Sequence, residues 1–230
     1  MQMVILCGGL ATRLGKYSKN TPKSMIDIEG KPFLEYQIEI LKKHSIKDIL
    51  LCVGHLSDEI RRYFGNGSKF DVNIKYSYDG YKLLGPIGAV KNAEPLLENI
   101  FFIMYGDSYI KVDFQKVYSK FIKHNKLGLM TVFKNYDKYD KSNIAVENDL
   151  VVDYKKSNRT KEIVYIDYGM SVLRKESLDY VPKDEFFSTD KFFSNLINIR
   201  QLLAFEVKNR FYHIGNPDSL EEFRSFIRSL

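Results

Sequence analysis

Short apolar runs alternate with amphipathic segments through the first half of the chain, and this alternation constrains the fold more than any other feature. The apolar runs have the length and composition of buried strands, whereas the segments between them place apolar residues at helical spacing. The strand-like runs are MVILC, DILLCVG, VNIKYSY and IFFIMYGD, and the helix-like segments are PFLEYQIEILKKH, DEIRRYF and AVKNAEPLL. Repeated strand–helix–strand order predicts a parallel sheet with helices on both faces.

From about Leu127 the pattern changes to short strands separated by polar stretches, which predicts an antiparallel extension of the same sheet. The strands are LGLMTVFK, NIAVEN, LVVDYKK and VYIDYGMSVL, and the runs at 135–141 and 155–162 are expected to be solvated loops. Asn216 followed by Pro217 is typical of the start of a closing helix. The sequence contains no repeat, low-complexity tract or long linker, so residues 1–230 are interpreted as one α/β domain.

Composition narrows the class of protein. A chain of 230 residues with 44% hydrophobic content can bury a core, which excludes a peptide hormone, a disulfide-stapled mini-protein and a disordered tail. The sequence shows neither a secretory signal nor an apolar run of roughly 20 residues that would span a membrane. Cys7 and Cys52 lie in apolar strands and fit no zinc spacing, so we expect reduced cysteines in a cytoplasmic protein without a membrane partner.

Basic residues exceed acidic ones, with 35 Lys and Arg against 29 Asp and Glu and a net charge of +6. This excess suits nucleic acid, an anionic membrane surface or a small polyanionic substrate, and composition does not choose among them. The absence of tryptophan, of a recognised nucleic-acid motif and of a continuous basic helix argues against nucleic acid. The placement of the basic residues therefore matters more than their number.

The segment after the first strand has the composition of a phosphate-binding turn. Gly8 and Gly9 end the strand, and the absence of a Cβ lets backbone N–H groups approach a phosphate or a base edge. Arg13 and Lys23 follow, with two further lysines between them. The spacing matches neither a P-loop nor a G-x-G-x-x-G fingerprint, so this loop is predicted to bind phosphate by another design.

Residues 6–14, followed by Thr21-Pro22-Lys23, resemble the signature of the sugar-1-phosphate nucleotidyltransferases, G-G-x-G-T-R-L and then P-K-P. The resemblance continues in the family's order nearly to the end of the chain. Its further motifs are Pro32-Phe33-Leu34, Leu84-Gly85-Pro86-Ile87-Gly88-Ala89, Tyr105-Gly106-Asp107, Asp167-Tyr168-Gly169 and His213-Ile214-Gly215-Asn216-Pro217. The resemblance implies a Rossmann-like three-layer αβα nucleotidyltransferase domain, with a mixed, mostly parallel central sheet and a small antiparallel extension. It also implies an enzyme that joins an NTP to a sugar 1-phosphate and releases pyrophosphate.

The implied reaction needs cations and alignment more than proton transfer, because a phosphate monoester with a second pKa of about 6 is already mostly dianionic at neutral pH. Three residues are the candidate catalytic groups by this resemblance. Arg13 would bind the β- and γ-phosphates through its guanidinium fork. Lys23 would neutralise the α-phosphate or the incoming sugar phosphate. Asp107, after a buried strand, would bind Mg²⁺, which prefers oxygen ligands.

The same resemblance assigns two groups of binding residues. The nucleotide-binding candidates are Leu6, Gly8, Gly9, Gly85 and Gly88, where the backbone would pass close to the nucleotide. The acceptor-binding candidates are Asn143, Lys156, Asp167 and Gly169, with Lys155 as the alternative to Lys156. Carboxylate and amide groups suit sugar hydroxyls, and a lysine suits the sugar phosphate.

Two departures from the family pattern leave questions open. Pro86 replaces the usual threonine or serine and removes a hydroxyl and an N–H, so the preferred base is not predicted. His213 stands where many members place an aspartate that shares the metal, and neutral imidazole is a poor ligand for Mg²⁺. Either Asp107 and the substrate phosphates hold a single ion, or another carboxylate such as Asp218 contributes.

The favoured interpretation is an enzyme that transfers a nucleoside monophosphate to a hexose or heptose 1-phosphate. Compact chains of this length are similar to heptose 1-phosphate guanylyltransferases and N-acetylmuramate 1-phosphate uridylyltransferases. Two alternatives stay open: a cytidylyltransferase that acts on a non-sugar small phosphate, and a catalytically silent regulatory subunit that binds a nucleotide sugar. His213 keeps the silent subunit open, whereas the retained Arg13, Lys23 and Asp107 argue against it. The sequence also leaves a homodimer open.

Overall fold

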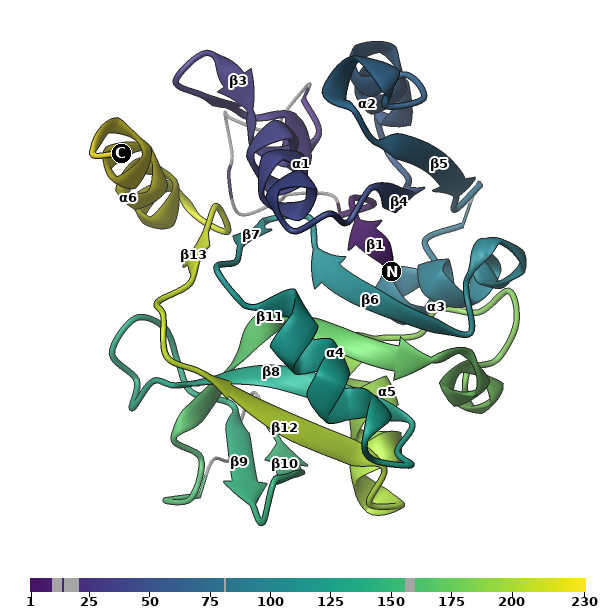
Figure 1. Ribbon diagram of the computed structural model, residues 1–230, viewed down its shortest axis with the longest axis vertical. Coiled ribbons are helices and arrows are strands. Elements are labelled where there is room, and N and C mark those ends of the chain that lie inside the picture. Colours follow the sequence, from purple (N-terminus) through teal and green to yellow (C-terminus); the bar gives the residue numbers. More distant parts are fainter. Residues whose placement is uncertain (10–13, 15–20, 81, 156–159) are drawn as a thin grey trace.

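The chain folds around one mixed β-sheet with helices on both of its faces (Figure 1). The computed structural model describes residues 1–9, 14, 21–80, 82–155 and 160–230. The strands of the sheet are β1 (Gln2–Leu6), β4 (Asp48–Val53), β5 (Asn73–Tyr78), β6 (Ile100–Tyr105), β8 (Gly128–Lys134), β9 (Ile144–Glu147), β10 (Leu150–Tyr154), β11 (Tyr165–Arg174) and β12 (Leu202–Val207). They follow the order β5-β4-β1-β6-β11-β8-β12-β10-β9.

Strands β5, β4, β1 and β6 are parallel, as the alternation of strands and helices predicts. Strand β11 is antiparallel to both β6 and β8, and β10 is antiparallel to both β9 and β12. Strands β8 and β12 are parallel to each other. Among the strands described, β10 and β11 alone run against the common direction, which confirms the predicted mixed, mostly parallel sheet.

The second half of the chain is more regular than the sequence pattern predicts. It contains the helix α5 (Thr189–Asn198) and the strand β12, and neither is among the predicted elements. Helix α4 (Phe114–Ile122) is also unpredicted. Because β12 pairs in parallel with β8, this half of the sheet is not a purely antiparallel extension.

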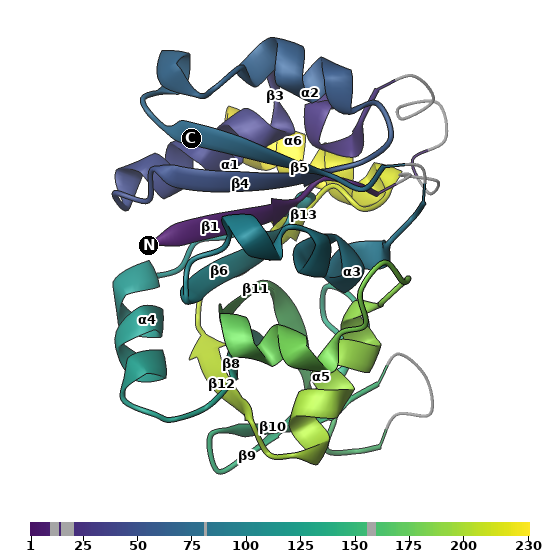
Figure 2. The same cartoon turned by 90° about the vertical axis from the view of Figure 1, so that its right-hand side faces the viewer.

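Helices α1 (Phe33–Lys43), α2 (Ser57–Phe64) and α4 pack on one face of the sheet, and α3 (Gly85–Asn92) and α5 pack on the other. Side chains alternate between these faces along each strand. Met3 and Ile5 therefore pack in one apolar cluster, whereas Val4 packs in the other. In Figure 2 the sheet separates α4 from α5. The fold thus has the three layers that the sequence predicts.

In a third apolar cluster, the C-terminal helix α6 (Pro217–Arg228) packs against the start of α1. The rings of Phe223 and Phe33 meet edge to face with their centroids 5.0 Å apart. Helix α6 begins where predicted, because Asn216 caps it by accepting a hydrogen bond from the Ser219 N–H at 3.0 Å.

The remaining elements are short. They are the strand pairs β2 (Asp27–Ile28) with β3 (Lys31–Pro32) and β7 (Ser108–Tyr109) with β13 (Tyr212–His213), and the 3₁₀ turns η2 (Lys23–Met25), η3 (Ser68–Phe70), η4 (Glu94–Leu96) and η5 (Lys175–Tyr180).

Both cysteines, Cys7 and Cys52, are buried free thiols, as predicted. None of the described helices combines the length and the apolar character that a bilayer crossing requires.

Candidate active site

Two cavities open at the edge of the sheet where the parallel strands β1, β4, β5 and β6 end. The first, which we call the β1 pocket, has a volume of about 490 Å³ and is lined by Leu6, Cys7, Gly8, Gly9, Lys23, Ser24, Cys52, Asp79, Leu83, Gly85, Pro86, Ala89, Tyr105, Gly106, Asp107, Phe186 and Gly215. The second, the β11 pocket, has a volume of about 350 Å³. Tyr105, Asp107 and Gly215 line both pockets, so the two cavities share a wall at the end of β6.

The β1 pocket brings together most of the residues that the sequence assigns to the nucleotide and its phosphates. Those that line it are Leu6, Gly8, Gly9, Lys23, Gly85 and Asp107. Gly88 does not line it: this residue is buried, and a Cβ built on it would lie 2.6 Å from the carbonyl oxygen of Glu185. Arg13 lies outside the described residues.

The amino end of α3 contacts the segment 185–187 of the chain. The N–H groups of Ile87 and Gly88 donate to the carbonyl oxygen of Phe187 at 3.1 and 3.3 Å, and the Phe187 N–H donates to the carbonyl oxygen of Leu84 at 2.8 Å. The sequence interpretation directs this backbone at the base. In the structure, the two helix N–H groups are instead already bound by the neighbouring segment.

Asp107 is held in place by contacts to its own backbone and to the residues beside it. The side chain of Gln37, buried on α1, donates to the carbonyl oxygens of Tyr105 at 2.9 Å and Ser108 at 2.7 Å. The carbonyl oxygen of Asp107 itself accepts a hydrogen bond from the Ile214 N–H at 2.9 Å. Helix α1 and the residue after β13 thus fix the turn that presents this carboxylate to both pockets.

Lys23 and Asp107 form an ion pair on the shared wall, with 2.5 Å between Nζ and Oδ2. Burial on its own would raise the pKa of Asp107, but the Lys23 ammonium outweighs this effect and holds that pKa below its ordinary value. The Ser108 hydroxyl also donates to Oδ1 at 3.3 Å. Asp107 is therefore ionised at neutral pH, with a cationic side chain beside it.

This donor set fits a magnesium ion that arrives with phosphate ligands. Within the described ranges, no group of three or more His, Cys, Asp or Glu side chains is placed to hold a metal ion. Mg²⁺ in phosphoryl-transfer sites typically takes one or two carboxylates and completes its shell with water and substrate phosphates. Asp107 supplies one such carboxylate. Asp218, the alternative ligand considered from the sequence, is exposed and lines neither pocket.

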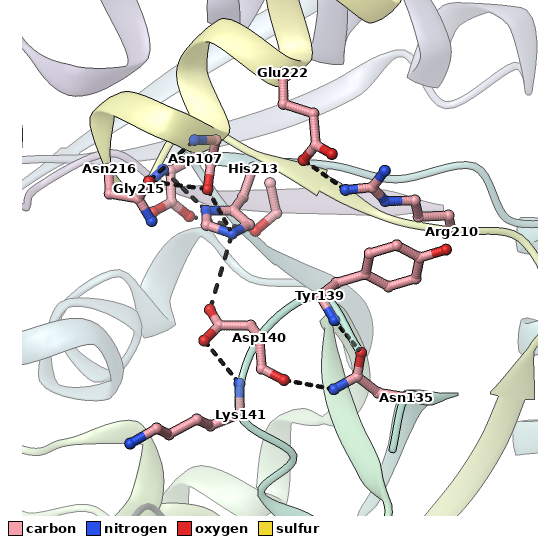
Figure 3. Close-up of polar contacts among 12 residues, drawn as sticks. Asp107, Asn135, Tyr139, Asp140, Lys141, Arg210, His213, Gly215, Asn216 and Glu222 are labelled. Atoms are coloured by element: carbon pink, nitrogen blue, oxygen red, sulfur yellow. Dashed lines mark hydrogen bonds and ion pairs between the residues drawn. The ribbon is translucent and has the colours of Figure 1, made fainter. Parts of the chain in front are cut away.

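Both ring nitrogens of His213 are occupied by local hydrogen bonds (Figure 3). Nδ1 accepts from the Gly215 N–H at 3.0 Å, and Nε2 lies 3.2 Å from the Ser219 hydroxyl oxygen. Because that hydroxyl donates to Asn216 Oδ1 at 3.1 Å, we assign the proton to Nε2, which then donates to Ser219. Burial lowers the pKa of His213, which favours this neutral ring. His213 is thus bound into the turn before α6 and offers no free nitrogen to a metal.

The β11 pocket contains the predicted acceptor residues Asn143, Asp167 and Gly169. The Asp167 carboxylate accepts hydrogen bonds from the Tyr105 hydroxyl and the Gly169 N–H, both at 2.9 Å. Asn143 Oδ1 accepts from the Asp167 N–H at 3.0 Å. These contacts fix two polar side chains at the cavity wall. Lys156 lies outside the described residues, and Lys155 pairs with Asp153 at 2.8 Å.

The run at 135–141 is a largely exposed loop, as the sequence predicts, but one of its residues is buried and holds it through hydrogen bonds. Asn135 is buried, and its side chain donates to the carbonyl oxygen of Asp140 at 2.6 Å and accepts from the Tyr139 N–H at 3.2 Å. The guanidinium of Arg210 stacks 4.0 Å from the Tyr139 ring centroid and pairs with Glu222 of α6 at 2.5 Å (Figure 3). Arg210 thus connects this exposed loop to helix α6, through Tyr139 on one side and Glu222 on the other.

Asp140 is a lining residue of the β11 pocket that the sequence did not single out. Its Oδ2 lies 3.9 Å from His213 Nε2, and its Oδ1 accepts from the Lys141 N–H at 2.8 Å. It places a second carboxylate near the shared wall.

Asp79 is a second site residue that the sequence did not single out. It directly follows β5 and lines the β1 pocket beside Gly8, where an added Cβ would lie 3.2 Å from Asp79 Oδ2. Burial raises the pKa of Asp79 to about 6. A signal that could have found it is an acidic residue within two positions of the carboxyl end of a parallel strand, which is also where Asp107 lies.

Comparisons with known proteins agree with this geometry. The family model for nucleotidyl transferases matches residues 2–229. The D-glycero-alpha-D-manno-heptose 1-phosphate guanylyltransferase of Campylobacter jejuni is 31% identical over 226 residues, which cover 97% of this chain and 98% of that protein. The protein of the same name from Aneurinibacillus thermoaerophilus is 29% identical, over 95% of this chain and 94% of the relative.

A solved structure extends the comparison to three dimensions. HddC from Yersinia pseudotuberculosis, complexed with GMP-PN, is 26% identical and superposes with a TM-score of 0.82 over 98% of this chain and 99% of that one. The resemblance recognised in the sequence is thereby confirmed over nearly its whole length. This chain is a sugar-phosphate nucleotidyltransferase and belongs to the nucleotidyl transferase family.

Proposed function

We propose that this enzyme transfers GMP from GTP to a hexose or heptose 1-phosphate, giving a GDP-sugar and pyrophosphate, with Mg²⁺ bound at Asp107. The observation that carries the choice of GTP is the half-buried carboxylate of Asp79 in the β1 pocket. The guanylyltransferase relatives from Campylobacter jejuni and Aneurinibacillus thermoaerophilus support the same base and suggest a heptose acceptor.

Asp79 suits guanine because the bases differ in how hydrogen-bond donors and acceptors are arranged along the edge of the ring. Guanine presents N1–H and the N2 amino group side by side, and a carboxylate accepts both with its two oxygens. Adenine and cytosine place an unprotonated ring nitrogen beside the amino group, which repels a carboxylate oxygen. Uracil has one N–H between two carbonyl oxygens. A carboxylate at this position therefore favours guanine over the other three bases.

The remaining residues fit a nucleotide that lies along the β1 pocket with its phosphates at the shared wall. Gly8 lies beside Asp79, and Gly8 and Gly9 line the same pocket as Lys23 and Asp107, where their backbone suits the close approach of phosphate oxygens. Lys23 stands where the α-phosphate and the acceptor phosphate would meet, and its cationic charge offsets their repulsion. We retain Arg13 for the β- and γ-phosphates and Lys156, or Lys155, for the sugar phosphate.

The acceptor would occupy the β11 pocket, with its sugar hydroxyls against Asn143 and Asp167 and its phosphate at the shared wall. A dianionic phosphate attacks the α-phosphorus without a general base. Bound Mg²⁺ would neutralise charge on the phosphates of the nucleotide. The enzyme's own contribution is alignment, because Asp107 lines both pockets and would hold the two phosphates close together.

Asp79→Asn is expected to lower kcat/KM for GTP by roughly 10- to 100-fold, since the amide replaces one acceptor oxygen by a donor that faces the guanine donors. Pyrophosphate release from the four NTPs, each with a panel of sugar 1-phosphates, measures this preference. Asp71→Asn, an exposed carboxylate in the loop before β5, is the matched control and should leave kcat/KM unchanged. A wild-type enzyme that prefers another base, or an Asp79→Asn variant with unaltered GTP kinetics, would contradict the assignment of guanine.

Asp79→Asn is expected to stabilise the free protein although it lowers activity, because the pKa of Asp79 is raised in the folded state. A carboxyl whose pKa is raised on folding, here to about 6, destabilises the folded state increasingly as pH rises from about 4, its ordinary pKa, and fully above about 6. Asp79→Asn should therefore raise Tm of the free protein at pH 7 to 8, and this gain should vanish below about pH 4, where the wild-type carboxyl is protonated in both states. Differential scanning fluorimetry across this pH range measures both the gain in Tm at neutral pH and its disappearance at low pH.

His213→Ala is expected to leave the dependence of activity on Mg²⁺ concentration unchanged, because both ring nitrogens serve the turn before α6. It should instead lower Tm, since the Gly215 N–H and the Ser219 hydroxyl lose a buried partner, at a cost of about 1–3 kcal/mol. Magnesium titrations of pyrophosphate release, paired with thermal unfolding, separate the two effects. A large shift in the Mg²⁺ requirement would show that the ring turns toward the metal in the loaded enzyme.

A further inference from the structure

Two large apolar side chains stand exposed on the rim of the β1 pocket. Leu83 is 55% exposed and Phe186 is 64% exposed, and both line the cavity. They come from segments far apart in the sequence, the approach to α3 and the approach to α5. Exposed apolar side chains gathered at the mouth of a cavity indicate a ligand with an apolar surface, because the bound ligand removes them from water.

The backbone that carries Phe186 is held firmly although its ring is exposed. The next residue, Phe187, is 2% exposed and exchanges three backbone hydrogen bonds with the start of α3, through Leu84, Ile87 and Gly88. The ring of Phe186 lies directly over Gly85, where a Cβ would approach its Cε2 to 2.9 Å. Phe187 therefore anchors the segment at the cavity mouth. Because the backbone of Phe186 is already held in place, a ligand that binds its ring loses little free energy to ordering the segment.

We propose that Phe186 is a base-binding residue whose aromatic ring covers the open face of the nucleobase in the β1 pocket, together with Leu83. The inference rests on the proposed function in that it needs a nucleotide in this pocket, but it does not need that nucleotide to be GTP. Every base has an aromatic face, so stacking tolerates all four. Asp79 and Phe186 then have separate tasks, because the carboxylate reads the edge of the base and the ring holds its face.

Stacking on the rim also explains why the residue is aromatic and why it is placed away from the phosphates. The glycine turn and Lys23 bind groups that all four NTPs share, and these groups leave the base free to tilt. A ring held over the base restricts that tilt. Removal of one stacked aromatic residue typically weakens binding by roughly 10- to 100-fold.

Phe186→Ala tests this inference through nucleotide affinity and stability together. The Kd of the NTP by calorimetry and its KM by pyrophosphate release should each rise about tenfold or more. The kcat at saturating nucleotide should change little, because the reacting atoms are at the other end of the pocket, and Tm should be unchanged because the ring is exposed. Phe186→Tyr should bind the NTP with the wild-type Kd, whereas the Kd of Phe186→Leu should lie between those of the wild type and Phe186→Ala. Tyr180→Ala is the matched control, an exposed aromatic residue in η5 that lines neither pocket.

The outcomes of this experiment separate the inference from the proposed function. A Phe186→Ala variant that binds the preferred NTP as tightly as the wild type overturns the inference alone. A variant with unchanged nucleotide affinity but an altered association state in sedimentation also overturns it, since the ring then covers a contact between copies of the chain. If the wild type prefers an NTP other than GTP, that NTP is the probe, and a raised Kd in Phe186→Ala supports the inference although the assignment of guanine has failed. If the wild type binds none of the four NTPs, both proposals fail.

Discussion

Asp107→Asn is expected to lower kcat by about 10³-fold while the protein stays folded. The substitution removes the negative charge that would bind Mg²⁺ at the shared wall, and no other carboxylate lines both pockets among the described residues. It also leaves the Lys23 ammonium without its partner, so the phosphates meet a changed charge distribution. Pyrophosphate release at saturating GTP, acceptor and Mg²⁺ measures the loss, with Asp71→Asn as the control for a change of charge elsewhere.

Thermal unfolding of Asp107→Asn provides an independent check on the ion pair. The pKa of Asp107 is held below its ordinary value, so the paired carboxylate stabilises the folded state above that ordinary value and loses this effect as pH falls through its folded pKa. The variant should therefore be less stable than the wild type at pH 7 and equally stable at low pH. Near-normal turnover in Asp107→Asn would refute the metal assignment, whatever the effect on Tm.

Lys23→Met is expected to lower kcat/KM by about 10²-fold or more for both the nucleotide and the acceptor. Methionine keeps most of the apolar stem of lysine and removes the charge that offsets repulsion between two phosphates. Initial rates with each substrate varied at saturating levels of the other measure the two effects separately. Lys31→Met, which removes a lysine paired with Glu39 away from both pockets, is the matched control.

The effect of Lys23→Met on both substrates is the distinguishing result. A lysine that served only the triphosphate would alter the kinetics of the nucleotide and leave those of the acceptor unchanged. An unaltered rate for both would show that the ion pair with Asp107 persists when substrates bind, and that Lys23 is a structural partner of Asp107.

The parallel half of the fold was predictable because its signals are local. Strands β1, β4 and β6 are short apolar runs, and helix α1 between β1 and β4 has an amphipathic pattern. Helix α1 begins directly after Pro32 and ends before His44, within a residue of the predicted bounds at each end. The cap at Asn216 was predictable for the same reason, since a cap depends on residues within one turn.

The second half was less predictable because its order depends on pairing between distant segments. Helix α5 carries a usable signal, with Phe192 and Leu196 one turn apart and a capping serine at 188. The parallel pairing of β12 with β8 joins strands about 70 residues apart, and no local pattern encodes the choice of partner. The loop at 135–141 is largely exposed, as predicted, but the burial of Asn135 and its hydrogen bonds to Tyr139 and Asp140 were not predictable from the polar composition of the run.

The candidate site also contains residues that local motifs predict and residues that only the fold brings together. The glycine turn, Lys23 and Asp107 were found because they lie in short motifs. Asp79 and Phe186 are single residues in loops, and they gain a role only because strand ends and two distant segments converge on one cavity. For His213 the sequence left the role of the ring open, because only the hydrogen bonds to its two nitrogens decide whether a metal could use them.

The wall that the two pockets share has a consequence for the end of the catalytic cycle. A nucleotide sugar contains both halves of the reaction in one molecule, so in the proposed arrangement it would occupy the β1 pocket and the β11 pocket together. Joining two ligands converts the second binding event into an intramolecular one and raises the overall affinity without any new contact. On this arrangement we expect the product to act as a bisubstrate inhibitor of its own synthesis. The steady-state rate would then depend on how fast a consuming reaction withdraws the nucleotide sugar, with no separate regulatory site.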